Sequence, residues 1–335
     1  MTDSEDSGAG DDVPGVPKRS LSTYARLWQL ETWLRRMVYV ELRALRGDDW
    51  NADIPKLGNS FQSDKRLIHM PTPEMDALSY APLSTLKKAI DDSWSLFSPY
   101  LPPQNIWQAK LEEISQIRHR VAHFRVGHED DLQRVIQFLR DLDKGFWHFC
   151  TSYNDEDTPL PPADDPVIAH FLDLDPFPWT EVSDKHWARI GIADPELVVA
   201  VSIEVSRRGW VQRESPVDGK PGYFYDVRFH ARDRRCFDYE GFLKNTRAIH
   251  RHCAHVCLSG LDNHIRLTIP AVLGSQQVIP VVQRCLDVAR NGVTRSHCQR
   301  GKAQRIANEW PEYVLGPEDP LGFLNPGMPC SFFGA

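Results

Sequence analysis

A cluster of cationic and imidazole side chains occupies Ile117–Arg125, whose sequence is Ile-Arg-His-Arg-Val-Ala-His-Phe-Arg. An imidazole can donate or accept a proton near neutral pH. A guanidinium stays charged and can hold two oxygens of a phosphate or carboxylate. His119 and His123 are one helical turn apart and would share a helix face, while Arg118 borders the apolar stripe that contains Ile114. The cluster therefore offers proton transfer beside an anion-binding cation.

A purely structural interpretation of the same residues stays open. Nearby acids could pair with the arginines, and His123 would then only cap the end of a helix. The arginines are Arg118, Arg120 and Arg125, and the acids are Glu112, Glu113 and Asp130.

The segments that would position the cluster are predicted to form an up-down helical bundle at residues 20–150. Apolar residues recur every three or four positions in Leu21–Arg46, with Ser22 as the N-cap and Gly47 as the end of the helix. Prolines make Asn51–Pro82 irregular. The same periodicity predicts further helices at residues 84–97, 106–121 and 130–149.

The cluster and its helices resemble the HEPN superfamily, all-α domains named for higher eukaryotes and prokaryotes nucleotide-binding proteins. The family signature is an arginine, a polar residue, three further residues and a histidine. Arg118 to His123 fit this spacing, with His119 as the polar residue. The resemblance covers roughly residues 20–150 and includes Glu31–Arg36, the Asp48–Trp50 turn and the Phe138–Asp143 segment.

This resemblance implies a metal-independent endoribonuclease without a cofactor, in which two motifs face each other across a homodimer of the helical domain. Arg118 would hold the phosphate, His123 would be the general acid or base, and His119 would orient substrate or water. The ribose 2′-hydroxyl would attack and leave a 2′,3′-cyclic phosphate. The resemblance also implies an effector of a toxin–antitoxin or antiphage defence system, with an antitoxin or regulatory partner.

The rest of the chain divides into segments that differ in composition and in the spacing of their apolar residues. Residues 1–19 are predicted to be a disordered acidic tail and residues 151–184 an acidic, proline-rich linker. Residues 185–335 are expected to form an α+β domain with an antiparallel sheet, which would sense a trigger or bind RNA or a regulator. Its predicted strands are 197–205, 223–229 and 265–269, its hairpin loop is 216–222, and its helix is 276–290.

Charge is distributed unevenly along the chain. The net charge is -7, yet residues 185–310 carry 20 basic and 12 acidic side chains. The turn Arg228–Arg235 alternates arginines with an aromatic residue, as nucleic-acid-binding surfaces do. Its charges could equally protect a solvated strand edge. The predicted RNA contacts are Arg120, Arg125, Arg232, Arg234 and Arg235.

Two other functional classes remain open: a non-catalytic HEPN bundle that dimerises or binds a partner, and a nucleic-acid-binding protein that acts through its basic C-terminal domain.

The segment His250–Cys257 lacks the spacing of a zinc site, so we predict half-buried cysteines and exposed histidines there. The chain has no glycine-rich phosphate loop and no nucleophile elbow, which argues against P-loop enzymes and serine hydrolases.

The predicted location is the cytoplasm. Seven cysteines in a chain of this size do not suggest a disulfide scaffold. The acidic N-terminus is unlike a secretory signal, and the longest purely apolar run, Leu197–Val201, is too short to cross a bilayer, so no membrane partner is expected.

Overall fold

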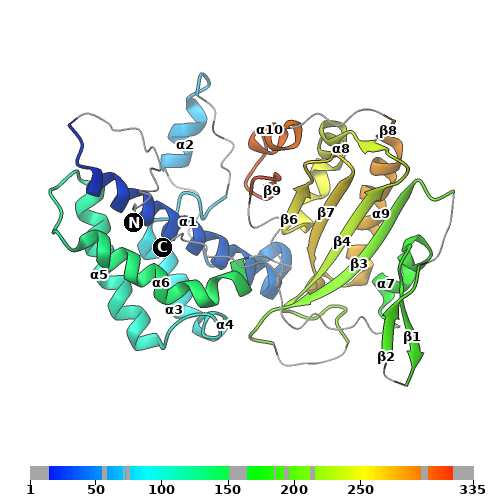
Figure 1. The fold of residues 1–335 in the computed structure, drawn as a ribbon, viewed down its shortest axis with the longest axis horizontal. Helices are drawn as coiled ribbons and strands as arrows, with labels where there is room; N and C mark the ends of the chain where they lie inside the picture. Colours follow the sequence, from blue (N-terminus) through cyan, green and yellow to red (C-terminus); the bar gives the residue numbers. More distant parts are fainter. Residues whose placement is uncertain are drawn as a thin grey trace, which may run out of the picture.

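The computed structural model describes most of the chain in two parts, a helical part and a part that contains a sheet (Figure 1). It describes residues 15–54, 59–70, 72, 76–150, 164–184, 186–191, 196–211, 216–295 and 301–319, with backbone only for 143–150. The prediction of a helical N-terminal region followed by an α+β region with mainly antiparallel strands is confirmed.

The helical part is built around one long helix, α1 (Lys18–Arg46). Its start differs from the prediction, because Pro17 and not Ser22 is the N-cap, and residues 18 and 19 therefore belong to the helix and not to a disordered tail. Its end is as predicted, since Gly47 takes a φ of 57°, which favours glycine. The other helices are α2 (Asn59–Arg66), α3 (Leu83–Asp92), α4 (Trp94–Phe97), α5 (Gln104–Ala122) and α6 (Asp131–Cys150).

Two details of this part depart from the sequence-based prediction. The segment expected to be irregular contains α2, whose Phe61 ring packs edge-on against Tyr80 at 5.5 Å between centroids. The helix expected over residues 84–97 is divided at Ser93 into α3 and α4. For α2 the outcome depends on a contact with Tyr80, outside the helix, which periodicity does not contain.

The C-terminal part is organised around a five-stranded sheet in the order β3-β4-β7-β6-β9. All neighbours are antiparallel except β6 and β9, which are parallel. The three predicted strands and the hairpin between the first two are confirmed. The sheet consists of β3 (Val199–Arg207), β4 (Tyr223–Ala231), β7 (His264–Pro270), β6 (His255–Leu258) and β9 (Val314–Leu315). Smaller elements are β1 (Trp179–Ser183), β2 (His186–Arg189), β5 (Cys236–Phe237), α8 (Tyr239–Thr246), β8 (Val293–Thr294) and α10 (Lys302–Asn308).

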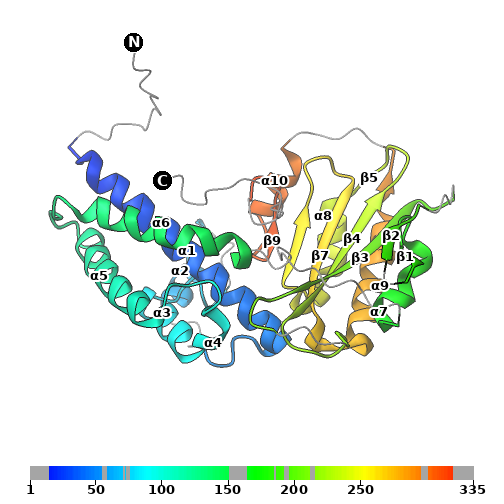
Figure 2. The ribbon, with the colours of Figure 1, turned by 60° about the horizontal axis from the view of Figure 1, so that its bottom comes forward.

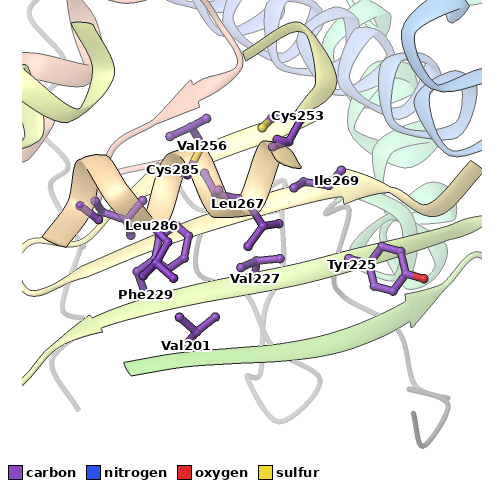
Figure 3. Close-up of a cluster of buried hydrophobic side chains, with 14 of the residues drawn as sticks. Val201, Tyr225, Val227, Phe229, Cys253, Val256, Leu267, Ile269, Cys285 and Leu286 are labelled. Carbon is purple, nitrogen blue, oxygen red and sulfur yellow. The ribbon is translucent and has the colours of Figure 1, made fainter. Parts of the chain in front are cut away.

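One face of the sheet is covered by α9 (Ser275–Asn291), which agrees with the helix predicted at 276–290. Alternate strand residues such as Val201, Val227 and Leu267 point toward Cys285 and Leu286 of this helix (Figure 3). These side chains are fully buried, and burial of each large aliphatic side chain contributes about 1.5–3 kcal/mol to the free energy of unfolding. Because side chains alternate along a strand, the opposite face of the sheet is left to the polar residues.

The interpretation of residues 151–184 as a linker is wrong for their described portion. Residues 164–184 fold onto the C-terminal part and include α7 (Pro166–Phe171), which buries Phe171 in the core between the sheet and α9. Asp165 caps this helix through the N–H groups of Val167 and Ile168, and it also accepts a hydrogen bond from the Tyr225 hydroxyl at 2.9 Å. In this portion the acidic residues and prolines therefore cap a helix and form turns. Residues 151–163 lie outside the described part of the chain.

The histidines of residues 250–257 are buried and not exposed as predicted. His250 is 3%, His252 7% and His255 4% exposed. A helical turn of 3-10 type at Arg247–His252, which the sequence did not predict, turns the first two inward. His250 contacts the Thr246 hydroxyl at 2.8 Å, and His252 contacts Asp48 of the helical part at 2.6 Å. Cys253 and Cys257 are fully buried.

The C-terminal half of α1 joins the two parts of the molecule. Its last turns lie against one end of the sheet (Figure 2). The Tyr39 hydroxyl donates to the Ala254 carbonyl at 2.7 Å, and the Gly222 N–H donates to the Ala44 carbonyl at 2.8 Å. Because α1 belongs to the helical core and also packs Val40 and Ala44 against the sheet, it cannot shift without disturbing both parts. None of the helices among the described residues has the length and apolar character of a membrane-crossing segment.

Candidate functional site

The predicted catalytic residues lie together at the C-terminal end of α5. Ile114 and Ile117 anchor this end of the helix in the core, and the opposite side carries His119 and His123 in solvent. The two imidazole rings are 4.5 Å apart between centroids, with an angle of 67° between their planes. The spacing of four residues thus places both rings on one face, as the sequence predicted.

Arg118 lies between this exposed face and the neighbouring α1. Its Nε is 3.6 Å from Oε2 of Glu31, and its side chain is 41% exposed. The other oxygen of Glu31 accepts a hydrogen bond from Arg35 at 2.6 Å. The distance to Arg118 is too long for a hydrogen bond, so Glu31 attracts the guanidinium without occupying its donors. The acids that the sequence offered as partners were all close along the chain, and Glu31 comes from another helix.

Arg120 is held by a carboxylate of its own fold. Its guanidinium makes a two-point ion pair with Asp131, the first residue of α6, at 2.5 and 3.2 Å. Asp131 is buried and also accepts the His128 N–H at 2.9 Å. This ion pair fixes the loop between α5 and α6 and gives Arg120 a structural role, while its RNA contact stays a prediction.

The loop that follows His123 projects apolar side chains into solvent. Phe124 is 98% and Val126 is 93% exposed. Phe124 also has a φ of 52°, a left-handed conformation that bulky side chains rarely adopt. Arg125, a predicted RNA contact, is exposed between them. Phe124 and Val126 are therefore two apolar side chains that the single chain leaves uncovered next to His123.

One copy of this cluster cannot place both proton-transfer groups around a phosphate. In a phosphoryl displacement the attacking and leaving oxygens lie on opposite sides of the phosphorus. The rings of His119 and His123 contact each other, which leaves no room for a phosphate between them. This arrangement of one chain therefore does not place an acid and a base on opposite sides of a phosphate.

The other predicted RNA contacts lie in the turn after β4. Asp233 and Arg234 have φ angles of 55° and 59°, and the Arg235 guanidinium binds the Asp233 carboxylate at 2.9 Å. Arg234 is exposed, while Arg232 and Arg235 are half-buried. The turn belongs to the C-terminal part, whereas the His119 cluster lies at the end of α5 in the helical part (Figure 1).

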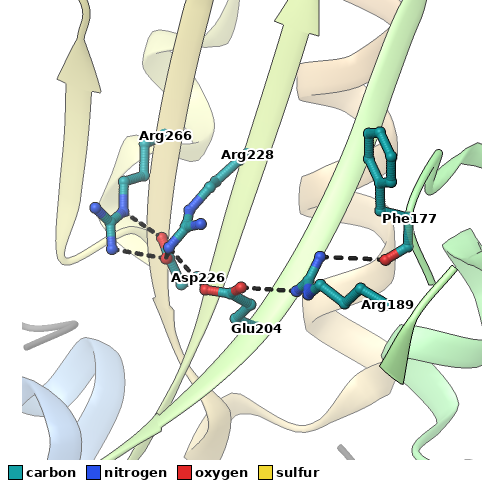
Figure 4. Close-up of polar contacts among 6 residues, drawn as sticks. All are labelled: Phe177, Arg189, Glu204, Asp226, Arg228 and Arg266. Carbon is teal, nitrogen blue, oxygen red and sulfur yellow. Dashed lines mark hydrogen bonds and ion pairs between the residues drawn. The ribbon is translucent and has the colours of Figure 1, made fainter. Parts of the chain in front are cut away.

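A second group of polar residues, most of which the sequence analysis did not single out, lies on the open face of the sheet. Asp226 is fully buried and binds both Arg228 and Arg266, and Glu204 binds Arg228 and Arg189 (Figure 4). The two arginines hold the pKa of the Asp226 carboxyl below its usual range despite its burial. The alternation of charged and apolar residues in Tyr223–Ala231 was the signal that could have revealed this row.

A cavity of about 620 Å³ lies where the helical part meets the C-terminal part. Tyr39, Trp50 and Tyr313 contribute aromatic walls, and Arg43 contributes a buried Nε without a hydrogen-bond partner among the described residues. Burial raises the pKa of the Asp76 carboxyl in this cavity to about 7. Among the described residues, no three or more histidine, cysteine or acidic side chains converge on a point where a metal ion could bind.

Comparisons of the chain with models of known protein families, with curated proteins and with solved structures gave no match.

Proposed function

We propose that the helical part is a HEPN-like ribonuclease domain and that the end of α5 is its active site. The observation that carries the proposal is the exposed pair His119 and His123 beside a half-exposed Arg118. Imidazoles exposed to solvent can exchange protons with a substrate, and a guanidinium that keeps free donors can bind its phosphate. In the HEPN-like arrangement this cluster would meet a second copy of itself.

The proposed reaction is cleavage of RNA through its own 2′-hydroxyl. A histidine acting as base, assigned to His123, takes the 2′-hydroxyl proton, and the 2′-oxygen bonds to the phosphorus. The bond from phosphorus to the 5′-oxygen breaks, and a histidine of the second copy donates a proton to that oxygen. Arg118 stabilises the charge that develops on the phosphate oxygens. The products are a 2′,3′-cyclic phosphate and a 5′-hydroxyl, and no metal ion takes part.

The exposed loop after α5 supports the homodimer that this chemistry requires. Phe124 and Val126 flank the histidines and are almost completely exposed in the single chain. A second copy placed with its motif facing this one would cover both side chains, which supplies an apolar driving force for association. A symmetric contact of this kind presents the same patch on both subunits.

A non-catalytic role for the helical part is the second candidate. The observation in its favour is the proximity of Glu31 to Arg118, since an arginine neutralised within its own subunit would bind phosphate less well. The basic C-terminal part acting alone on nucleic acid is the third. The system-level role, an effector of toxin–antitoxin or antiphage defence located in the cytoplasm, belongs to the proposal through the HEPN resemblance.

Cleavage of RNA in the presence of EDTA separates these candidates. The active-site proposal predicts that the wild-type protein cleaves RNA and that His123→Ala and Arg118→Ala do not. The C-terminal proposal predicts that the same variants keep full nucleic-acid binding and that loss of Arg232, Arg234 and Arg235 abolishes it. A non-catalytic bundle predicts no cleavage by any form of the protein.

A further inference from the structure

The open face of the sheet forms the floor of a cavity that the proposed ribonuclease chemistry does not use. Its volume is about 620 Å³, and the segment before β1 and the end of β2 form one of its walls. Three arginines line it: Arg189 from β2, Arg228 from β4, and Arg232 from the turn after β4. These residues come from three separate segments, so the cavity exists only in the folded C-terminal part.

Two of the three arginines, Arg189 and Arg228, are held in position before any ligand arrives. Glu204 binds Arg189 and Arg228, each at 2.7 Å. The backbone carbonyl of Phe177 also accepts a hydrogen bond from Arg189 at 3.2 Å (Figure 4). Behind them, the buried carboxylate of Asp226 binds Arg228. Side chains fixed in this way lose little conformational entropy when a ligand binds.

The charge of the cavity lining favours an anion. Its lining carries three arginines and Asp175, and Glu204 lies against two of the arginines, so one positive charge remains in excess among these residues. Each guanidinium has five N–H donors, and the ion pairs of Arg189 and Arg228 occupy only some of them. Planar guanidinium groups bind phosphate oxygens two at a time, which distinguishes this lining from a site for a point charge.

The shape of the cavity adds room for a flat group beside the anion. Ala200 and Ser202 are the floor residues contributed by β3, and both are small. The Phe177 ring stands at the rim with 55% of the residue exposed. An exposed aromatic ring next to arginines can stack with a base whose phosphate the arginines hold. The volume lies within the range of small-molecule sites, about 300–1,000 Å³.

We propose that this cavity binds a nucleoside phosphate, with the phosphate on Arg189, Arg228 and Arg232 and the base against Phe177. The ligand is a mononucleotide and not an RNA strand, because the three arginines line a single cavity of about 620 Å³, which is the size of a small-molecule site. The exposed Arg234 of the same turn does not line it. The proposal concerns the C-terminal part and holds whether or not the helical part cleaves RNA.

Isothermal titration of the full chain with ADP and GDP tests the proposal, with adenosine as the probe that lacks a phosphate. We expect both diphosphates to bind and adenosine to give no heat. Arg232→Ala should weaken binding by at least about tenfold, since it removes charge-assisted hydrogen bonds to phosphate. Arg234→Ala is the matched control, because it removes the same charge from the same turn outside the cavity, and it should leave affinity unchanged.

A second variant tests the cavity itself. Ser202→Phe fills the floor without changing any charge and should also abolish diphosphate binding, while an unchanged melting temperature shows that the protein remains folded. Failure of both diphosphates to bind at about 1 mM would overturn the proposal. Equal losses with Arg232→Ala and Arg234→Ala would overturn it too, as would binding of a single-stranded RNA by a protein that binds no mononucleotide.

Discussion

The carboxylate of Glu41, in the second half of α1, binds the guanidinium of Arg208, which follows β3, at 2.5 Å from Oε1 to Nη2. Both side chains are completely buried. The indole N–H of Trp210 donates to the other oxygen of Glu41 at 2.6 Å. This ion pair connects the helix that carries Glu31, the neighbour of Arg118, to the sheet of the C-terminal part.

Removal of one charge of this pair should destabilise the whole protein. Glu41→Gln leaves Arg208 buried without a counter-charge, which costs about 3–5 kcal/mol of the free energy of unfolding. Urea denaturation followed by circular dichroism measures the loss. Glu112→Gln is the control, because Glu112 contacts Lys87 in solvent, and it should leave the midpoint nearly unchanged. Similar midpoints for the two variants would contradict the assignment of a buried ion pair.

The stability of the protein should depend on the protonation of Asp76. Burial raises the pKa of this carboxyl to about 7 in the folded protein, from 3.8 for an exposed aspartate. The folded state therefore binds the proton more tightly than the unfolded chain, so the contribution of this group to stability falls as the pH rises from about 4 to about 7. Asp76→Asn removes that loss and keeps the acceptor for the Leu78 N–H.

At pH 8, Asp76→Asn should therefore be more stable than the wild type by on the order of 4 kcal/mol. At pH 4.5 most of that difference should be absent, because wild-type Asp76 is then protonated in the folded state. Urea titrations of both proteins at the two pH values measure the difference. A stability difference that is the same at both pH values would show that the carboxyl does not titrate as described.

The exposed ring of Phe124 should support association of two chains, while its backbone conformation lowers the stability of the single chain. Its left-handed backbone, with a φ of 52°, costs a bulky residue about 1–2 kcal/mol, whereas asparagine tolerates it. Phe124→Asn should thus keep or raise the melting temperature of the monomer and weaken the proposed homodimer. Light scattering after size exclusion measures the mass.

The matched control for this prediction is Ile106→Asn, an exposed apolar residue at the opposite end of α5. It should leave the mass of the assembly unchanged. A wild-type protein that is monomeric at all concentrations, or a dimer that survives Phe124→Asn, would remove this loop from the proposed contact.

Local patterns were sufficient to predict the main elements of the fold. The recurrence of apolar residues gave α1 and α5 within a few residues, because each buries one side of a helix. Runs of β-branched and aromatic residues bounded by Gly, Pro and Asp predicted β4 and β7, because such residues favour strands. The spacing of His119 and His123 also predicted their proximity, since helical geometry alone determines it.

Contacts between distant segments could not be predicted in the same way. Glu31 approaches Arg118 only because α1 packs beside α5. His252 is buried where Asp48 of the helical part provides a partner for its imidazole ring. Asp165 looked like part of a linker until the fold supplied Tyr225 as its partner. In each case the residue type was compatible with exposure, and tertiary packing decided its place.

The most direct test of the proposed active site is the rate of RNA cleavage by purified protein in EDTA, with the ends of the products analysed. We predict that the wild-type protein leaves 2′,3′-cyclic phosphates and that His123→Ala lowers the cleavage rate by at least about a hundredfold. His128 is an exposed histidine of the same loop, and His128→Ala should cleave at the wild-type rate. Equal cleavage by all three proteins, or no cleavage by the wild-type protein, would contradict the proposal.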